Sequence, residues 1–225
     1  HENLIANAQQ ISEWLGFGPT DRLLTIMPLF HMNAVSVTTM TALYARGSTV
    51  VAPKFSSSCF WDTVEKYRIT SFGSVATMLS MLLAKKDDRS TADSLLRFAM
   101  CGSAPVPAEI LKDFEETFGV LVIEGYGMSE STCRSTFNPP NENRRPGSCG
   151  VPIGNEMKVF DEGDKEVADG ELGEIVLRGP NIFKGYFKNP QATEKAFANG
   201  WFHTGDIGYR DADGFFYIAD RKSDM

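Results

Sequence analysis

The sequence predicts an α/β protein: a mostly parallel sheet flanked by helices, followed by a β-rich, barrel-like subdomain. Up to about residue 123, short apolar runs of strand length alternate with segments whose apolar residues have helical spacing. This alternation is typical of a parallel sheet covered by helices. From about residue 146, short strand-like runs are punctuated by Asp-Gly turns. We therefore expect two parts, residues 1–145 and 146–225.

The first part is expected to alternate five helices with five strands. Residues 3–15 carry apolar side chains at helical spacing, Gly47 is a stop signal for the second helix, and Pro107 starts the last one, where its missing N–H is harmless. The expected helices are 3–15, 32–44, 58–67, 77–84 and 107–118, and the expected strands are 22–27, 48–52, 69–72, 96–100 and 120–123.

A stretch rich in Asn, Pro, Arg and Gly, residues 138–150, predicts a long loop between the two parts. Its Arg144 and Arg145 are expected to be a solvated pair. Beyond the loop, Trp201 and Phe202 are expected to be core aromatics. The expected strands of the second part are 157–160, 174–178 and 215–219, and one helix is expected at about 190–198.

The composition is that of an ordinary globular protein, with 42% hydrophobic and 23% charged residues. The net charge of -7 and the absence of a Lys/Arg stripe argue against a nucleic-acid partner. No apolar run is long enough for a transmembrane helix and no signal peptide is visible, so we expect a cytoplasmic location. The four cysteines have irregular spacing and no Cys-x-x-Cys pair, which favours free thiols over a zinc site.

Three of the expected strands end in loops whose residue types suit a nucleotide: residues 28–33, 100–105 and 125–130. Ligands of open α/β sheets bind beyond the carboxyl ends of the strands. The glycines let backbone approach a ligand closely, Tyr126 can stack on a base, Ser129 can donate to a phosphate oxygen, and Glu130 can hold Mg²⁺. Each loop alone is a weak signal, since a single Gly-Tyr-Gly is more often only a turn.

The order and spacing of several motifs resemble the adenylate-forming superfamily of acyl-coenzyme A synthetases, firefly luciferases and peptide-synthetase adenylation domains. Residues 125–130 read GYGMSE, a core motif that usually has Thr where this chain has Ser129. Later motifs match at residues 170–175 (GELGEI), 185–186 (GY) and 201–206 (WFHTGD). The resemblance covers essentially the whole chain, from residue 1 to residue 225.

The resemblance implies a role for each matching position. Ser129 would contact the α-phosphate of ATP, Glu130 would coordinate Mg²⁺, Asp206 would hold the ribose hydroxyls with help from Arg221, and His31 would lie near the acyl and thiol channel. Ser129, Glu130 and His31 are thus the expected catalytic residues. The expected nucleotide-binding residues are Gly102, Ser103, Ala104, Glu124, Gly125, Tyr126, Gly127, Met128, Ser129, Asp206, Ile218 and Arg221, with Tyr126 stacked on the adenine. Two positions keep a structural alternative. His31 could be a packed loop histidine, and Glu174 could only pair with a nearby basic side chain.

The implied reaction is the ATP-dependent activation of a carboxylic acid to an acyl-adenylate, followed by transfer of the acyl group to coenzyme A. By family position, residues 72–78 and 31–33 would form the acyl pocket. Because residues 72–83 contain no Lys or Arg, a fatty or aryl acid is favoured over a dicarboxylate. The alternatives are an adenylating enzyme with another acceptor, such as a carrier protein or oxygen, and a non-catalytic nucleotide-binding homologue.

The family's phosphate loop would precede the segment that matches His1, and its small C-terminal domain would follow Met225. Ser223 would occupy the hinge between the domains, where Asp or Lys is commoner. We therefore expect residues 1–225 alone to have negligible ligase activity. A homodimer is the oligomer to test for.

Overall fold

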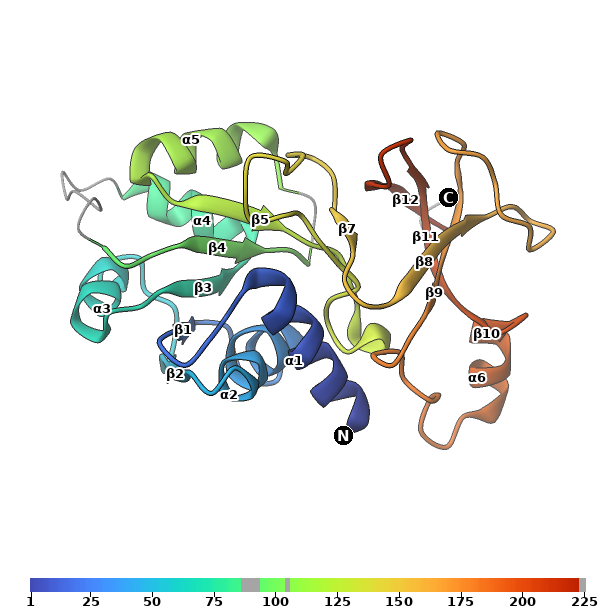
Figure 1. Ribbon diagram of the computed structural model, residues 1–225, viewed down its shortest axis with the longest axis horizontal. Coiled ribbons are helices and arrows are strands. Elements are labelled where there is room, and N and C mark those ends of the chain that lie inside the picture. The colour runs from blue at the N-terminus through green and yellow to red at the C-terminus, as the bar shows by residue number, and fades with distance from the viewer. Residues whose placement is uncertain (86–93, 104–105, 223–225) are drawn as a thin grey trace.

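The computed structural model describes residues 1–85, 94–103 and 106–222, and it contains a parallel and an antiparallel sheet that lie side by side (Figure 1). The predicted hinge residue Ser223 lies outside the described residues. The parallel sheet has the strand order β2-β1-β3-β4-β5, and every neighbouring pair in it is parallel. Its strands are β1 (Arg22–Thr25), β2 (Ser48–Val51), β3 (Ser71–Ser74), β4 (Phe98–Cys101) and β5 (Leu121–Glu124).

Helices cover both faces of the parallel sheet, as the alternating pattern predicted. Neighbouring residues of a strand point to opposite faces: in β4, Ala99 and Cys101 pack into the core on one face, and Phe98 and Met100 into the core on the other. The first core is completed by α3 (Phe60–Tyr67), α4 (Ala76–Ala84) and α5 (Ala108–Phe118), and the second by α1 (Glu2–Leu15), η1 (Asn33–Met40) and α2 (Thr41–Tyr44).

The expected single α-helix at 32–44 is instead a π-helical segment, η1, that continues into the short helix α2. Hydroxyl groups compete here for the backbone carbonyls: Thr38 Oγ1 donates to Ala34 O at 3.2 Å, and Thr41 Oγ1 donates to Ser36 O at 2.9 Å. Hydrophobic spacing did not reveal this competition. The widened turn begins at Asn33, a residue that lines the cavity described below.

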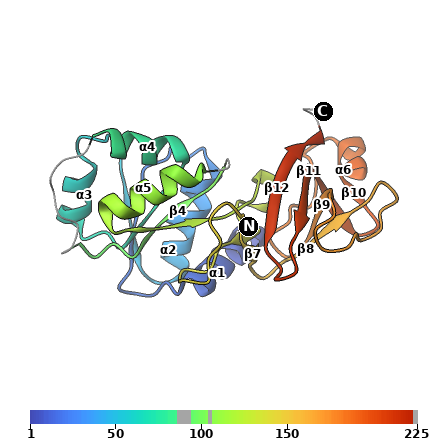
Figure 2. The same cartoon turned by 90° about the horizontal axis from the view of Figure 1, so that it is seen from above.

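The antiparallel sheet has the order β10-β11-β9-β8, with β12 on β11, and encloses its own apolar core. It is seen apart from the parallel sheet in Figure 2. The ten-residue strand β11 was not predicted, because its Gly205 and Asp206 resemble a ligand loop; Trp201 and Phe202 on it are buried, as expected. The elements are β8 (Glu156–Phe160), β9 (Gly173–Arg178), α6 (Pro190–Ala196), β10 (Phe197–Ala198), β11 (Trp201–Arg210) and β12 (Phe216–Arg221).

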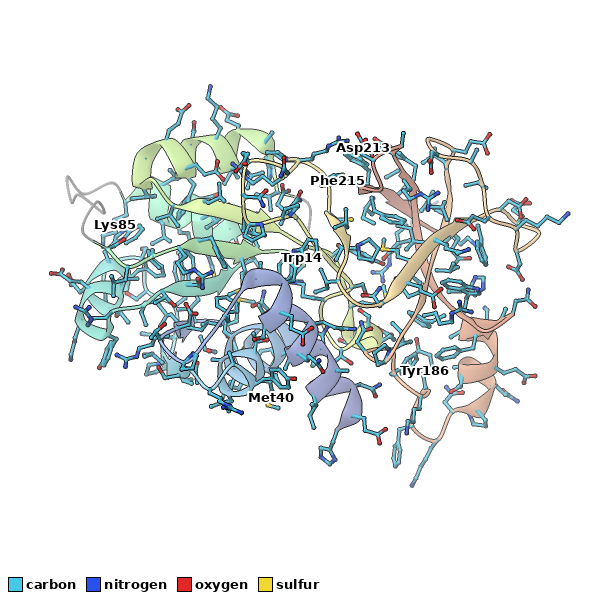
Figure 3. All side chains as sticks on the ribbon, viewed as in Figure 1. Trp14, Met40, Lys85, Tyr186, Asp213 and Phe215 are labelled. Carbon is cyan, nitrogen blue, oxygen red and sulfur yellow. The ribbon has the colours of Figure 1, made fainter. Side chains whose placement is uncertain are left out.

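The loop at 138–150 connects the two sheets through its arginines. The structure pairs Arg144 with Glu115 on α5, and the Arg144 side chain is only 14% exposed. Arg145 binds Asp211 at 2.6 Å and also Asp213, in the turn between β11 and β12 that Figure 3 marks at Asp213 and Phe215. The expectation of a solvated pair is therefore wrong for Arg144, because charges distant in sequence meet it in the fold. The loop is flanked by the short paired strands β6 (Thr136–Phe137) and β7 (Val151–Pro152).

Two expectations from composition agree with the described residues. Cys59, Cys101, Cys133 and Cys149 are all free thiols. Within the described ranges, no helix combines the length and the apolar character needed to cross a membrane.

Candidate active site

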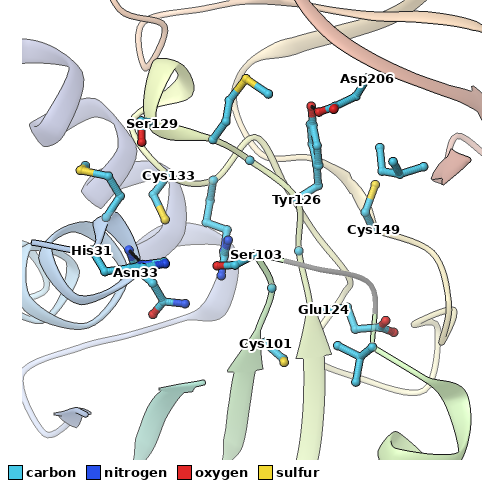
Figure 4. Close-up of a pocket in the computed structure, with 18 of the residues that line it drawn as sticks. His31, Asn33, Cys101, Ser103, Glu124, Tyr126, Ser129, Cys133, Cys149 and Asp206 are labelled. Carbon is cyan, nitrogen blue, oxygen red and sulfur yellow. Dashed lines mark hydrogen bonds between the residues drawn. The ribbon is translucent and has the colours of Figure 1, made fainter. Parts of the chain in front are cut away.

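A cavity of about 590 Å³ lies beyond the carboxyl ends of β4 and β5, where the antiparallel sheet faces the parallel one (Figure 4). That position and size are typical of small-molecule sites in α/β folds. Every expected catalytic or nucleotide-binding residue that the structure describes lines this cavity; Ala104 lies outside the described residues. The cavity is lined by Phe30, His31, Met32, Asn33, Cys101, Gly102, Ser103, Val106, Glu124, Gly125, Tyr126, Gly127, Met128, Ser129, Glu130, Cys133, Arg134, Gly147, Ser148, Cys149, Asp206, Ile218 and Arg221.

Glycines allow the loops after β4 and β5 to lie against each other at the cavity wall. A β-carbon on Gly102 would lie 2.6 Å from the carbonyl oxygen of Gly125, and one on Gly125 would lie 2.5 Å from the carbonyl oxygen of Thr136. Such contacts do not occur between real atoms, so any larger residue would separate the segments. Both glycines line the cavity, so their backbone forms part of its wall, against which a flat base can lie.

A chain of three side chains, joined by a hydrogen bond and an ion pair, links the loop after β5 to the antiparallel sheet. The Tyr126 hydroxyl donates to Asp206 Oδ2 at 2.6 Å, and Asp206 Oδ1 pairs with Arg221 Nε at 3.2 Å. Burial and then the Asp206 charge raise the pKa of Tyr126 well above its usual value, so the hydroxyl stays protonated and donates. The chain fixes the Tyr126 ring and places a carboxylate on β11 beside it, which suits a base and its ribose diol.

Ser129 and Glu130 lie on a short 3₁₀ turn, η2 (Ser129–Ser131), at the more open side of the cavity. The backbone of this turn is held by Phe183, whose N–H donates to Glu130 O at 2.8 Å, and the Tyr186 hydroxyl donates to Glu130 Oε1 at 3.0 Å. The described residues contain no group of three His, Cys, Asp or Glu side chains that could hold a metal ion. One accessible carboxylate fits Mg²⁺ that takes its remaining ligands from phosphate oxygens and water.

His31 makes the packing contact of its structural alternative and also lines the cavity. Its Nδ1 accepts the backbone N–H of Asn33 at 3.2 Å, which satisfies one ring nitrogen, while the ring still lines the cavity (Figure 4). The other side of the expected acyl pocket does not reach the cavity. None of residues 72–78 lines it, because the Asn33 side chain occupies the space against Gly73.

The three cysteines of the cavity wall, Cys101, Cys133 and Cys149, are not nucleophiles. Burial raises the pKa of Cys101 to about 11 and that of Cys149 to about 12, and it also raises the pKa of Cys133. The thiolate is the reactive form of cysteine. These side chains therefore contribute small apolar surface rather than chemistry.

Glu174 has the structural role that was its alternative. Its carboxylate contacts His203 Nδ1 and Lys222 Nζ, both at 2.9 Å, and accepts the N–H of Gly205 at 3.0 Å. Burial would raise its pKa, but these bonds from His203, Lys222 and Gly205 outweigh burial and lower it. The residue ties β9 to β11, close to the bulged region that presents Asp206.

Glu124, at the end of β5, allows the effect of burial on the pKa of a cavity carboxylate to be tested. The side chain is buried and accepts the N–H of Gly147, yet burial raises its pKa from 4.5 to about 7. Between these values the folded protein binds one more proton than the unfolded chain, so the free energy of unfolding falls as the pH rises. We expect Glu124→Gln to remove this fall, worth up to about 3 kcal/mol, while keeping an acceptor for Gly147.

Urea unfolding between pH 5 and pH 8 measures this difference. Glu142→Gln, in an exposed part of the loop at 138–150, is the matched control and should follow the wild type. Equal pH dependence in the wild type and Glu124→Gln would show that Glu124 is not the titrating group.

One further cavity residue, Arg134, was not predicted from the sequence. It is a lone basic residue four positions after the GYGMSE motif, in a run of small residues. Its side chain is 1% exposed and lines the cavity.

Comparisons with known proteins agree with this geometry. Residues 1–187 match the family model of AMP-binding enzymes. The chain is 40% identical over 226 residues to a sulfoacetate–CoA ligase of Cupriavidus necator and 35% identical over 229 residues to an oxalate–CoA ligase of Arabidopsis thaliana; each match covers 99% of the chain and 44% of the relative.

The crystal structure of ATP-bound MatB from Rhodopseudomonas palustris superposes with a TM-score of 0.92 at 34% identity, over 100% of the chain and 45% of MatB. The chain thus spans less than half the length of the proteins it matches. With the family match over residues 1–187 and the superposition of both sheets on a relative, the chain belongs to the AMP-binding enzyme family.

Proposed function

We propose that the protein containing these residues activates a carboxylic acid with ATP and transfers the acyl group to coenzyme A. The observation that carries this proposal is the single cavity that brings the GYGMSE loop together with Asp206 and Arg221. In the first step, a carboxylate oxygen bonds to the α-phosphorus of ATP and the bond to the pyrophosphate oxygen breaks. In the second step, the sulfur of coenzyme A bonds to the acyl carbon and AMP leaves.

The chain's own residues position these groups. Tyr126, fixed by Asp206, offers its ring to the adenine, and Asp206 with Arg221 offers acceptor and donor atoms to the ribose hydroxyls. Ser129 donates its hydroxyl to the α-phosphate, where negative charge concentrates as the carboxylate approaches. When bound at Glu130, Mg²⁺ supplies positive charge that offsets the repulsion between two anions.

The substrate has two candidates. An apolar fatty or aryl acid is supported by the lack of Lys and Arg in residues 72–83. An acid with a second anionic group is supported by the buried Arg134 in the cavity wall and by the names of two relatives, since sulfoacetate and oxalate each carry two anionic groups. The second candidate agrees better with the cavity, because Arg134 lines it and none of residues 72–83 does. A cytoplasmic location and a homodimer are further proposals of the same kind.

Exchange of labelled pyrophosphate into ATP tests the first step in the full-length protein. We expect exchange that depends on an added acid, and a fall of about 10²-fold or more in Glu130→Gln. Glu142→Gln, on the exposed loop, is the control and should keep full exchange.

The same assay separates the competing functions. ATP binding without exchange for any acid would favour a non-catalytic homologue. Exchange followed by trapping with hydroxylamine, but no product with coenzyme A, would identify another acceptor.

A further inference from the structure

A buried guanidinium in the cavity wall has no anionic partner among the described residues. Two contacts with Asn7 fix the backbone of Arg134: its N–H donates to Asn7 Oδ1 at 3.2 Å, and Asn7 Nδ2 donates to its carbonyl oxygen at 2.6 Å. Its residue exposure is 1%, and the side chain reaches the cavity. The backbone is thus anchored on α1 while the charged end lies at the site.

Backbone and an aromatic ring are two neighbours of this guanidinium. A β-carbon on Gly102 would lie 2.6 Å from its Nη2, so the group lies close to the end of β4, and its Cζ is 5.3 Å from the centre of the Phe137 ring. Its Nε and Nη2 are buried without a hydrogen-bond partner, and no carboxylate of the described residues forms an ion pair with it. An aromatic face compensates only part of a full charge.

Leaving a charge in this position is unfavourable. Arginine does not lose its proton in proteins, so the group cannot become neutral as a buried lysine can. An unpaired buried charge destabilises a protein by several kcal/mol. Such a cost is retained where a ligand supplies the counter-charge, and the planar guanidinium donors match the oxygens of a carboxylate or sulfonate.

A second unsatisfied polar group lies in the same cavity wall. Asn33, at the start of η1, is fully buried, and both its Oδ1 and its Nδ2 lack a partner. Its side chain fills the space over Gly73, between the cavity and the residues expected to form an apolar acyl pocket. The wall therefore offers an amide N–H and a guanidinium, where a long apolar chain would need apolar contacts.

We propose that Arg134, assisted by Asn33, binds a second anionic group of the acid, so that the preferred substrate is a short acid with a carboxylate at one end and a carboxylate or sulfonate at the other. The inference rests on the proposed function. The carboxylate at the first end is activated toward Ser129 and Glu130, which lie at the more open side of the cavity. The second group pairs with the buried guanidinium, and this pairing gives specificity.

Matched acids test the proposal in the full-length protein: malonate, succinate and sulfoacetate against propionate, butyrate and hexanoate. We expect the wild type to favour the dianionic acids by about 10²-fold or more in kcat/KM for pyrophosphate exchange, since a site built for a polar group rejects the analogue that lacks it. Arg134→Met should remove that preference and change the KM for ATP less than about 3-fold. Arg134→Lys, which keeps the charge but loses the planar fork, should lie between them.

Thermal unfolding gives a second readout without turnover. Sulfoacetate or malonate at millimolar concentration should raise the Tm of the wild type and leave that of Arg134→Met unchanged. Without acid, Arg134→Met should be at least as stable as the wild type, because an apolar side chain replaces an unpaired charge.

Several outcomes would overturn the proposal. Equal losses for all acids in Arg134→Met would place the guanidinium on the reacting carboxylate, and a large rise in the KM for ATP would place it on the nucleotide. An unchanged dianion preference would remove Arg134 from recognition altogether. If no acid supports exchange even in the wild type, the proposed function fails first, and this result is distinct from the other three.

Discussion

Replacing Gly127 by alanine is expected to destabilise the protein by about 3 kcal/mol or more, near the upper end of overpacking effects. The residue lies in the middle of the GYGMSE motif, where a β-carbon would overlap the carbonyl oxygen of Cys133 and lie 2.9 Å from the Cα of Arg134. Both obstacles are backbone, so neither can move by a change of rotamer. The loop and the segment after η2 would have to separate, and with them Tyr126 and Arg134, which lie on opposite sides of this contact.

Urea unfolding measures the loss of stability, and binding of ATP measures the loss of the site. Gly18→Ala is the matched control: no atom lies within 4 Å of its new β-carbon and its φ is not positive, so we expect a change below about 1 kcal/mol. If Gly127→Ala were as stable as the control, the close approach of the two segments would not exist in solution.

The layout of the parallel sheet could be predicted because its signals are local. Each strand is a short apolar run, each helix has its own spacing, and the parallel arrangement follows from their alternation. The nucleotide side of the site could be predicted for a related reason. Residues at the carboxyl ends of neighbouring parallel strands meet at one edge of the sheet, so the loops after β4 and β5 converge.

What the sequence did not reveal depends on contacts between distant residues. The environment of Arg134 is set by Asn7 on α1 and by Gly102 at the end of β4, and that of Arg144 by Glu115 on α5. The strand β11 escaped prediction because Gly205 and Asp206 interrupt its apolar alternation at the point where its pairing with β9 shifts register. In each case the structure is determined by the site or by tertiary packing rather than by the local sequence pattern.

Asp206→Ala is expected to raise the KM for ATP by about 10²-fold in pyrophosphate exchange. If the carboxylate accepts both ribose hydroxyls, the variant loses two charge-assisted hydrogen bonds, each worth about 1.5–3 kcal/mol. It also releases the Tyr126 hydroxyl and Arg221 Nε, the two groups that now hold the carboxylate. The loss is thus larger than that of a residue that only shapes the cavity.

Tyr126→Phe distinguishes two ways in which Asp206 could contribute to ATP binding: direct contact with the ribose, and fixing of the Tyr126 ring. It removes the 2.6 Å bond to Asp206 but keeps the ring and the carboxylate. If Asp206 binds ribose directly, Tyr126→Phe should raise the KM for ATP by less than about 10-fold, well below the effect of Asp206→Ala. If Asp206 acts only by fixing the ring, the two variants should be equally impaired.

Asp169→Ala, which removes an exposed ion pair with Arg210 at the far end of β11, is the control and should leave the KM for ATP unchanged. A 2′-deoxy-ATP comparison completes the argument, because wild-type protein should discriminate against the missing hydroxyl and Asp206→Ala should not.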